Sequence, residues 1–543
     1  MIDFQRLGPL GAASLVVAAL ILLPIFAVVS SVFAPASGTW SHLVQTALGA
    51  YVWNTALLLA GTAAGVMSMG VLAAWLVTAY RFPGQRLLEW ALVLPLAMPA
   101  YVTAYAYTDW LQFTGPVQSW LRAATGWQAR DYWFPEVRSL WGAAAMLSFA
   151  LYPYVYLVAR TAFLDLSRSA LEAGRLAGHS AWGSFVRVAL PLARPAIAAG
   201  TALALMETLA DFGTVSYFAL EVFTTGIFKA WFSMGDSDAA GQLSAWLLGF
   251  VVLVLALERA SRGRAAYASA TRKPALPQRL AGAPAALAFA ACAAPVVFGF
   301  LLPAGILLQL VLASPEARWG VRVLALVGNS FILAGITAAL GVVLATAMAY
   351  AARLSRSRPV AIANRCASLG YAIPGAVIAV GILVPLARFD NWLAAWVEAS
   401  FGMRIGLLLT GTIVALVYAY LVRFLAAAMN TMEAGLAKIT PSMEDAARSL
   451  GAGPASTLAR VHLPLLGSSL ATAGLLVFLD VMKELPATFA LRPFNFDTLA
   501  IEAYQLAQDE RLAEAAVPSL VIVAVSVLPL LVVWRRYFQA TRS

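Results

Sequence analysis

Four carboxylates stand at repeated positions in a chain that is otherwise poor in charge. Glu207 and Asp211 are four residues apart, and Asp480 and Glu484 repeat that spacing 273 residues later. On a helix, the two acids of each pair would share one face. Carboxylate oxygens suit hard cations, so the four acids are candidates for a transient metal site on a transport path. The alternative is structural: the pairs cap and close the outer gate through hydrogen bonds, and Lys483 neutralises one charge.

The other reactive side chains exclude several kinds of site. Two cysteines (Cys292, Cys366) and three histidines (His42, His179, His462) are too few and too scattered for a disulfide framework or a Cys/His metal cluster. The same scatter argues against a membrane-embedded enzyme. The chain contains no Gly-x-x-x-x-Gly-Lys-Ser/Thr phosphate loop. Any ATP hydrolysis linked to it must come from a separate polypeptide, and we expect no permanently bound cofactor.

The elements that position the acids are predicted to be membrane-spanning helices. Of the 543 residues, 62% are hydrophobic and 11% are charged, whereas soluble domains are about 25% charged. A span needs about 20 mostly apolar residues, and continuous runs are unlike the alternation of a membrane barrel. Twelve stretches qualify: Pro9–Phe33, Thr55–Tyr80, Leu88–Thr108, Leu140–Phe163, Phe185–Val215, Ser244–Leu257, Ala283–Leu312, Ser330–Ala351, Ser368–Ala387, Leu407–Ala428, Leu458–Met482 and Ala515–Trp534. The predicted fold class is an all-α integral membrane protein in a lipid bilayer.

The acids are predicted to lie deep in this membrane. Counted at about 1.5 Å per residue from Pro191 and Pro464, the first acid of each pair lies about 24 Å in and the second about 30 Å in, near the outer boundary. Unpaired carboxylates there cost several kcal/mol, so we expect them to face a cavity or another helix. Tyr101, Tyr105 and Tyr107 are expected in the outer aromatic belt, with oxygen ligation of a cation as the alternative.

The distribution of positive charge predicts the orientation. With the N-terminus inside, inner segments hold 25 of the 36 Lys and Arg residues and outer loops hold 11, which places both termini in the cytoplasm. The net charge of +10 is therefore explained by topology, and nucleic acid is excluded as a partner. The first apolar run is longer than that of a signal peptide, so we expect an uncleaved span, although Ala34-Pro35-Ala36 follows it.

The chain also repeats itself. Asn54-Thr55 recurs as Asn329-Ser330 and Met98-Pro99 as Ile373-Pro374, both 275 residues later. This predicts two tandem six-helix halves in one orientation, residues 1–262 and 281–543, joined by a cytoplasmic linker at 263–280.

The most detailed repeat lies in the inner loops after spans four and ten. Residues 169–178 (SALEAGRLAG) align with residues 442–451 (SMEDAARSLG), and Leu-Pro follows each at 190–191 and 463–464. Ser169 with Glu172, and Ser442 with Asp445, predict capping boxes that begin short helices. Gly178 and Gly451 predict left-handed C-terminal caps. Small residues on each helix would give a smooth side for another protein: Ala173 and Gly174, then Ala446 and Ala447.

These loops resemble the Glu-Ala-Ala-x-x-x-Gly loop of ATP-binding cassette importer permeases. Gly174 replaces the second Ala in the first loop, and Asp445 replaces the Glu in the second. The resemblance covers both halves and implies a fused type I permease in the bacterial inner membrane. It further implies that both loops carry coupling helices, which dock on two ATP-hydrolysing subunits and convert ATP turnover into alternating access. The residues to which this role is assigned are Glu172, Ala173, Gly174, Gly178, Asp445, Ala446, Ala447 and Gly451.

A narrower resemblance points to the substrate. The segments 207–218 (ETLADFGTVSYF), 224–231 (TTGIFKAW), 480–488 (DVMKELPAT) and 491–500 (LRPFNFDTLA) are similar to ferric-iron importer permeases, which receive Fe³⁺ from a periplasmic binding protein. Related permeases carry thiamine, putrescine or other small solutes, and an ion-coupled secondary transporter would use the same acids. The resemblance implies Fe³⁺ as the substrate, with Glu207, Asp211, Asp480, Lys483 and Glu484 in the path or gate.

Overall fold

The computed structural model describes residues 8–166, 180–262, 277–315, 320–355 and 357–540. Within this part, ten helices are long and apolar enough to cross a membrane. Two bent helix pairs, at 85–125 and 454–482, with bends of 93° and 75°, bring the total to twelve when each pair is counted as one span. They coincide with the twelve predicted stretches, so the predicted all-α membrane fold is confirmed. Strand pairing in the described residues is limited to β1 (Tyr80–Arg81) and β2 (Gln278–Arg279), which are parallel.

The chain divides into two compact units, and each combines distant stretches. Unit 1 contains residues 1–40, 227–245 and 320–501, and unit 2 contains residues 41–226, 246–319 and 502–543. Each unit therefore takes helices from both predicted sequence halves. Four helices have residues assigned to each of the two units: α2 (Gly38–Thr46), α12 (Phe223–Phe228), α13 (Ser237–Arg262) and α25 (Leu499–Gln508).

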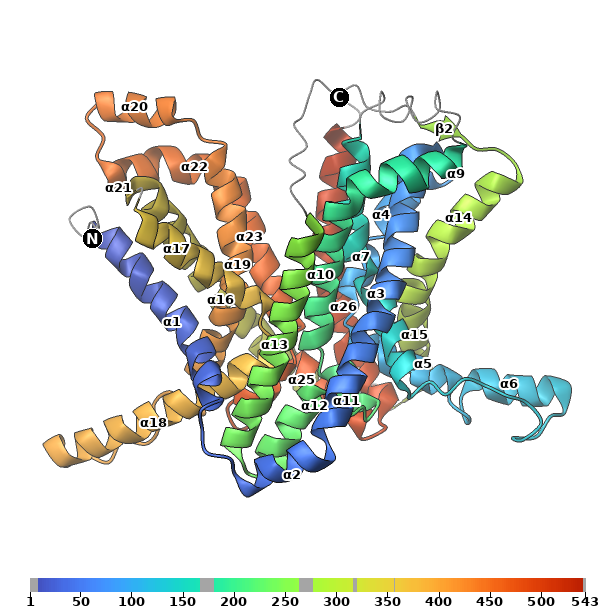
Figure 1. The fold of residues 1–543 in the computed structure, drawn as a ribbon, viewed down its shortest axis with the longest axis horizontal. Helices are drawn as coiled ribbons and strands as arrows, with labels where there is room; N and C mark the ends of the chain where they lie inside the picture. The colour runs from blue at the N-terminus through green and yellow to red at the C-terminus, as the bar shows by residue number, and fades with distance from the viewer. Residues whose placement is uncertain (1–7, 167–179, 263–276, 316–319, 356, 541–543) are drawn as a thin grey trace. The chain divides into compact units, whose positions relative to one another are not determined.

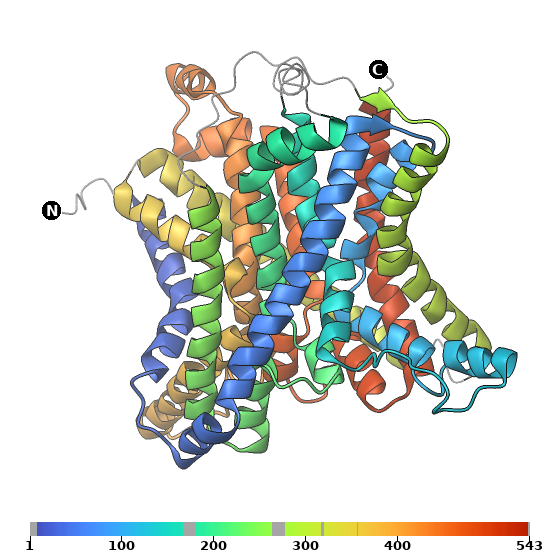
Figure 2. The ribbon, with the colours of Figure 1, turned by 45° about the vertical axis from the view of Figure 1, so that its right-hand side comes forward.

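Unit 1 is built around α16 and α19, with α1 packed along α17 and α18 (Figures 1 and 2). In Figure 1, α20 lies at the same end of the unit as α21 and α22, and α18 projects from the opposite end. Its elements are α1 (Pro9–Ser31), η4 (Lys229–Ser233), α16 (Val321–Ser355), α17 (Arg358–Ala367), η6 (Ser368–Ala372), α18 (Gly375–Phe401), α19 (Ile413–Ala437), α20 (Pro441–Ser449), α21 (Pro454–Thr457), η7 (Leu458–His462), α22 (Leu463–Leu465), α23 (Gly467–Met482) and α24 (Pro486–Leu491).

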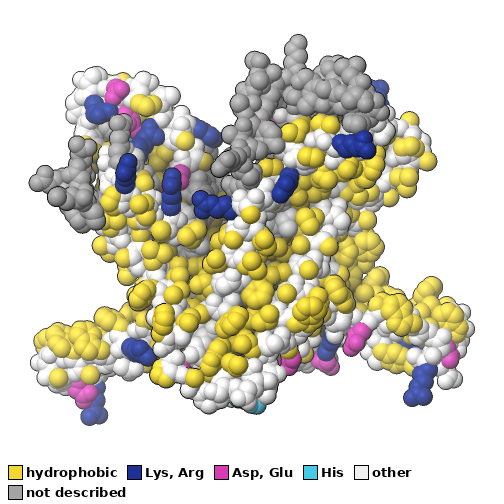
Figure 3. Space-filling view, viewed as in Figure 1, with side chains coloured by type: hydrophobic (Ala, Val, Ile, Leu, Met, Phe, Trp, Pro, Cys, Tyr) yellow, Lys and Arg dark blue, Asp and Glu magenta, His cyan; other side chains and the backbone are white. Residues whose placement is uncertain are grey.

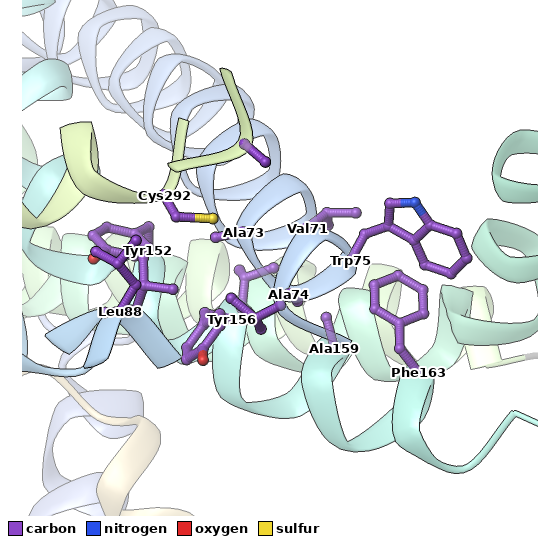
Figure 4. Packing of buried hydrophobic residues seen from close by; sticks show 14 of the residues in the cluster. Val71, Ala73, Ala74, Trp75, Leu88, Tyr152, Tyr156, Ala159, Phe163 and Cys292 are labelled. Atoms are coloured by element: carbon purple, nitrogen blue, oxygen red, sulfur yellow. The ribbon is translucent and has the colours of Figure 1, made fainter. Parts of the chain in front are cut away.

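Unit 2 has its core where α3 packs along α7 and α10. Figure 4 shows Trp75 beside Phe163, and the Cys292 sulfur among Ala73 and Tyr152. Cys292 is fully buried, as expected of a small hydrophobic side chain. The elements are α3 (Leu48–Ala79), α4 (Gln85–Ala91), η2 (Leu94–Ala97), α5 (Ala100–Leu111), α6 (Pro116–Thr125), α7 (Leu140–Leu164), α9 (Ala181–Ser184), η3 (Phe185–Ala189), α10 (Leu190–Ala210), α11 (Gly213–Tyr217), α14 (Ala283–Val296), η5 (Val297–Leu301), α15 (Leu302–Ala313) and α26 (Leu512–Ala540), with the two strands.

Large apolar side chains cover the flanks of both units. The surface in Figure 3 is mostly hydrophobic between its charged ends. Phe26 on α1 and Leu287 on α14 are each 71% exposed. A soluble protein would bury such residues, whereas lipid chains solvate them at no cost.

Repeated prolines break the helices at equivalent points. Met98 and Ile373 precede Pro99 and Pro374 and have extended backbones, with ψ of 112° and 126°. A proline ring disfavours the helical conformation of the residue before it. The chain therefore leaves one helix and enters α5 or α18 in a new direction.

The two Leu-Pro motifs, at 190–191 and 463–464, also lie at a change in backbone conformation. A five-residue π-helical segment ends just before each of them, at η3 and η7. Proline has no N–H to donate to the preceding turn, and the wider π turn accommodates its ring.

The tyrosines of α5 are not in an aromatic belt. Tyr101, Tyr105 and Tyr107 are 5%, 1% and 4% exposed. Tyr105 is hydrogen-bonded to Ser519, and Tyr107 donates to the carbonyl of Phe298 over 2.6 Å. The belt prediction was wrong because α5 turns into the interior of unit 2 after Pro99.

Candidate functional site

The two acidic pairs do not lie on continuous helices. α10 ends at Ala210, and Asp211 has an extended backbone with ψ of 130°. α23 ends at Met482, two residues before Glu484. The prediction that each pair shares one helical face is therefore wrong, because the helix stops between its two acids. Glu207 and Asp480 remain helical, and both are partly buried.

Asp211 and Glu484 instead hold the start of the next short helix. Asp211 Oδ1 accepts from the N–H groups of Thr214 and Val215 at 3.0 and 3.2 Å, and Oδ2 accepts from the Thr214 hydroxyl at 3.0 Å. Glu484 accepts from the N–H groups of Ala487 and Thr488, both at 2.9 Å, and from the Thr488 hydroxyl at 2.6 Å. Carboxylates at these positions satisfy helix N–H groups that have no partner within the helix. The repeat thus preserves a cap, as the structural alternative predicts.

Glu484 has a further partner that sequence reasoning missed. Arg423 of α19 places Nη1 3.2 Å from Glu484 Oε1, and the two side chains are 8% and 1% exposed. Gly375, the first residue of α18, lies against this pair: a β-carbon there would be 2.7 Å from Glu484 Oε1. At the equivalent positions of the first half stand Ala150 and Ala100. A single arginine inside an apolar span was the available signal, since buried charge is costly without a partner.

The remaining path residues are placed as follows. Lys483 Nζ lies 3.3 Å from Asp480 Oδ1, so the expected neutralisation of one acid is present. Glu207 belongs to unit 2 and Asp480 to unit 1. Among the described residues, no group of three His, Cys, Asp or Glu side chains could hold a metal ion together.

The second predicted coupling helix forms, but it begins earlier than expected. α20 starts at Pro441 with Thr440 as its N-cap, and the Thr440 hydroxyl lies 2.9 Å from that of Ser442. The capping box of Ser442 with Asp445 is therefore wrong. Proline suits the first helical position, since its missing N–H would have no partner there. Glu172, Ala173, Gly174 and Gly178 of the first loop lie outside the described residues.

The end of α20 follows the prediction. Gly451 has φ of +79°, the N–H of Gly451 donates to Arg448, and the N–H of Ala452 donates to Ala447, both at 3.0 Å. This is a Schellman cap, in which a left-handed glycine ends the helix.

The outer face of α20 differs in part from expectation. Asp445 pairs with Arg448 at 2.6 Å, and both side chains are about two-thirds exposed. Ala446 is exposed, whereas Ala447 is buried against the chain. The exposed apolar side chains beside Ala446 are Met443 and Leu450, which are 45% and 87% exposed. The candidate docking face is therefore Met443, Ala446 and Leu450.

A charged cluster lies behind this helix. Glu444 Oε1 accepts from Arg353 Nε at 2.5 Å and lies 3.3 Å from His462 Nε2. His462 is 1% exposed, and its ring meets that of Tyr350 edge-on at 5.3 Å.

The repeated Asn-Thr and Asn-Ser dipeptides make equivalent contacts in the two units. Asn54 and Asn329 donate their side-chain amides to the carbonyls of Glu221 and Asp497, at 2.9 and 3.0 Å. The hydroxyls of the next residues, Thr55 and Ser330, accept hydrogen bonds from the N–H groups of Phe223 and Leu499, at 3.4 and 2.9 Å. Each dipeptide thus fastens the loop beyond the capped short helix.

Comparison with known proteins agrees with these features. Residues 67–258 match the family described as binding-protein-dependent transport system inner membrane component. The Fe(3+)-transport system permease protein FbpB 2 of Haemophilus influenzae is 26% identical over 90% of both chains. The sulfate transport system permease protein CysT of Escherichia coli is 30% identical over 39% of this chain and 73% of its own. A putative molybdenum transport system permease protein of Bacillus subtilis, YvgM, is 28% identical over 35% of this chain and 81% of its own.

The many apolar helices of the described residues agree with these matches to inner membrane transport components. The chain belongs to the family of binding-protein-dependent transport system inner membrane components, the permease subunits of ATP-binding cassette importers.

Proposed function

We propose that this chain supplies both membrane halves of an importer that moves ferric iron into the cytoplasm. The iron arrives on a periplasmic binding protein. Two copies of a separate ATPase dock on the loops at 169–178 and 442–451, and both chain termini lie in the cytoplasm. The observation that carries the proposal is the match to an Fe(3+)-transport permease over 90% of both chains, which includes both repeated halves.

The acids take different parts in this proposal. Asp211 and Glu484 are engaged as helix caps, so their role is to hold the short helices α11 and α24 at the gate. Glu207 and Asp480 remain the candidates for passing contacts with the ion, and Lys483 offsets Asp480. Weak and transient contact suits a path, because an ion that binds tightly does not leave.

The match to sulfate and molybdenum permeases supports a second candidate, an oxyanion importer. Arg423 provides a cation at the capped helix, and a guanidinium suits oxyanions better than it suits Fe³⁺. These relatives, however, cover only one half of this chain or less.

Uptake into proteoliposomes separates the two candidates. The full chain is reconstituted with its ATPase and binding protein, and uptake of ⁵⁵Fe³⁺ is compared with uptake of ³⁵S-sulfate and ⁹⁹Mo-molybdate. Iron uptake alone supports the proposal, whereas oxyanion uptake without iron uptake replaces it by the second candidate.

A pair of variants tests the path assignment. Glu207→Gln with Asp480→Asn should slow ⁵⁵Fe uptake while ATP turnover continues. The matched control is Glu398→Gln, which removes an exposed carboxylate paired with Arg404 at 2.7 Å. If the variant with Glu207→Gln and Asp480→Asn takes up ⁵⁵Fe at the rate of the unmodified protein, these two acids have only a structural role.

A further inference from the structure

The charged cluster behind α20 joins the coupling helix to the transmembrane helices on both sides of its loop. Glu444 lies in the first turn of α20 and meets Arg353, in the last turn of α16, at 2.5 Å. The side chains of Arg353 and Glu444 are 20% and 22% exposed. An ion pair shielded to this degree is screened less than one at an open surface.

Arg353 also reaches the end of the helix that leads into the loop. Its Nη1 donates to the carbonyl of Leu436, and its Nη2 donates to the carbonyl of Ile439 at 2.6 Å. The Leu436 carbonyl belongs to the last turn of α19, where a helix leaves carbonyl groups without internal partners, and Ile439 lies two residues beyond the end of α19. One planar guanidinium therefore fixes α16, α19 and α20 together, and the single ammonium group of lysine could not contact all three acceptors in this geometry.

The chain that leaves the loop packs against the same cluster. His462, in the π-helical turn η7, lies 3.3 Å from Glu444 Oε1 and packs edge-on against Tyr350 of α16. The Tyr350 hydroxyl donates to the carbonyl of Pro454 at 2.9 Å, at the start of α21. Both connections of the coupling helix are thus held to α16.

The first half of the sequence does not carry these residues. At the repeat positions of Arg353, Glu444 and His462 stand Thr78, Leu171 and Ala189. The Thr78 hydroxyl donates to a carbonyl of its own helix, that of Ala74, at 2.8 Å. The loop sequence is repeated in both halves, but the residues of this ion pair stand at these repeat positions in the second half only.

We infer that Arg353, Glu444 and His462 form a brace that transmits movement of the second coupling helix to α16 and α19, and that the two coupling loops are therefore not equivalent. The inference rests on the proposed docking of an ATPase at α20. Asp445, at the family's coupling position, points outward with Arg448 and is free to face the ATPase while Glu444 faces the chain. These three are positioning residues: they hold the helix and do not contact substrate.

The test uses the reconstituted full chain with its ATPase and binding protein. Glu444→Gln and Arg353→Gln, alone and combined, are compared by the number of solute molecules imported per ATP hydrolysed. We expect this ratio to fall by about fivefold or more, the lower range of measured site-to-site coupling, while ATP is still hydrolysed. Glu444→Asp keeps the carboxylate and should recover part of the ratio.

Two controls complete the design. Arg404→Gln breaks an exposed ion pair with Glu398 on α18, outside both docking loops, and Thr78→Ala alters the first-half repeat position of Arg353; both should keep the ratio of the unmodified protein. The combined variant removes both charges of the pair, so neither is left without its partner. Its thermal unfolding in detergent is measured to establish that it is folded. An unchanged ratio in that folded double variant overturns the brace, as would an equal loss in Thr78→Ala. Absence of ATP-driven uptake by the unmodified protein would instead refute the proposed function.

Discussion

The two repeated caps should differ in their contribution to stability, because one of them is also half of a buried ion pair. Asp211→Asn and Glu484→Gln each replace a capping carboxylate by an amide whose oxygen can still accept N–H groups. Loss of a charged cap costs about 1 kcal/mol in each. Glu484→Gln additionally removes the carboxylate 3.2 Å from Arg423.

The extra cost follows from burial. Removing one partner of a buried pair costs about 3–5 kcal/mol. We take the lower end, about 3 kcal/mol, because Arg423 keeps other contacts, including the ring of Phe424 at 5.2 Å. Glu484→Gln should therefore lose about 4 kcal/mol and Asp211→Asn about 1 kcal/mol.

Thermal unfolding in detergent, followed by tryptophan fluorescence, measures the difference. We expect a clearly larger drop in the unfolding temperature for Glu484→Gln than for Asp211→Asn. Adding Arg423→Met to Glu484→Gln should recover part of the loss, since the charge left in the interior is gone. Equal drops for the two single variants, or strictly additive effects in the double variant, would refute the assignment of a buried ion pair.

Three further predictions test other parts of the structure. Gly375→Ala should lower the unfolding temperature, because its β-carbon would lie 2.7 Å from Glu484 Oε1; an unaffected unfolding temperature would contradict that packing. Gly451→Ala should cost about 1–2 kcal/mol of local stability at its φ of +79° and weaken ATPase binding, whereas Gly453→Ala, at φ of −74°, should not; equal ATPase binding by both variants would refute the cap. Asn329→Ala removes the bond to the Asp497 carbonyl and should increase proteolysis of the following loop, and unchanged cleavage would count against this fastening.

The sequence predicted the spans well because their signal is local. Each span is a run of apolar residues long enough to cross a bilayer, and that property needs no knowledge of partners. Pro99 and Pro374 act just as locally, since each restricts the residue before it wherever it stands, although the helix breaks at these two prolines were not predicted. Gly451 ended its helix as predicted for the same reason: its role depends on its own backbone.

The site was harder to predict, because its contacts join distant residues. A spacing of four is compatible with one helical face or with a helix that ends between the two acids, and Asp211 lies beyond such an end. Arg423 is 61 residues from its partner Glu484, and Arg353 is 91 residues from Glu444. Only the packing of α19 against α16, α23 and α24 brings these charges together.

The central claim is tested most directly by transport in a defined system. The chain is reconstituted in liposomes with its ATPase inside and the iron-loaded binding protein outside, and ⁵⁵Fe accumulation is followed with and without ATP. An ATP-driven importer accumulates iron only when ATP and the binding protein are both present, and its ATPase activity rises with the loaded binding protein. Accumulation driven by an ion gradient without ATP would contradict the account and identify a secondary transporter.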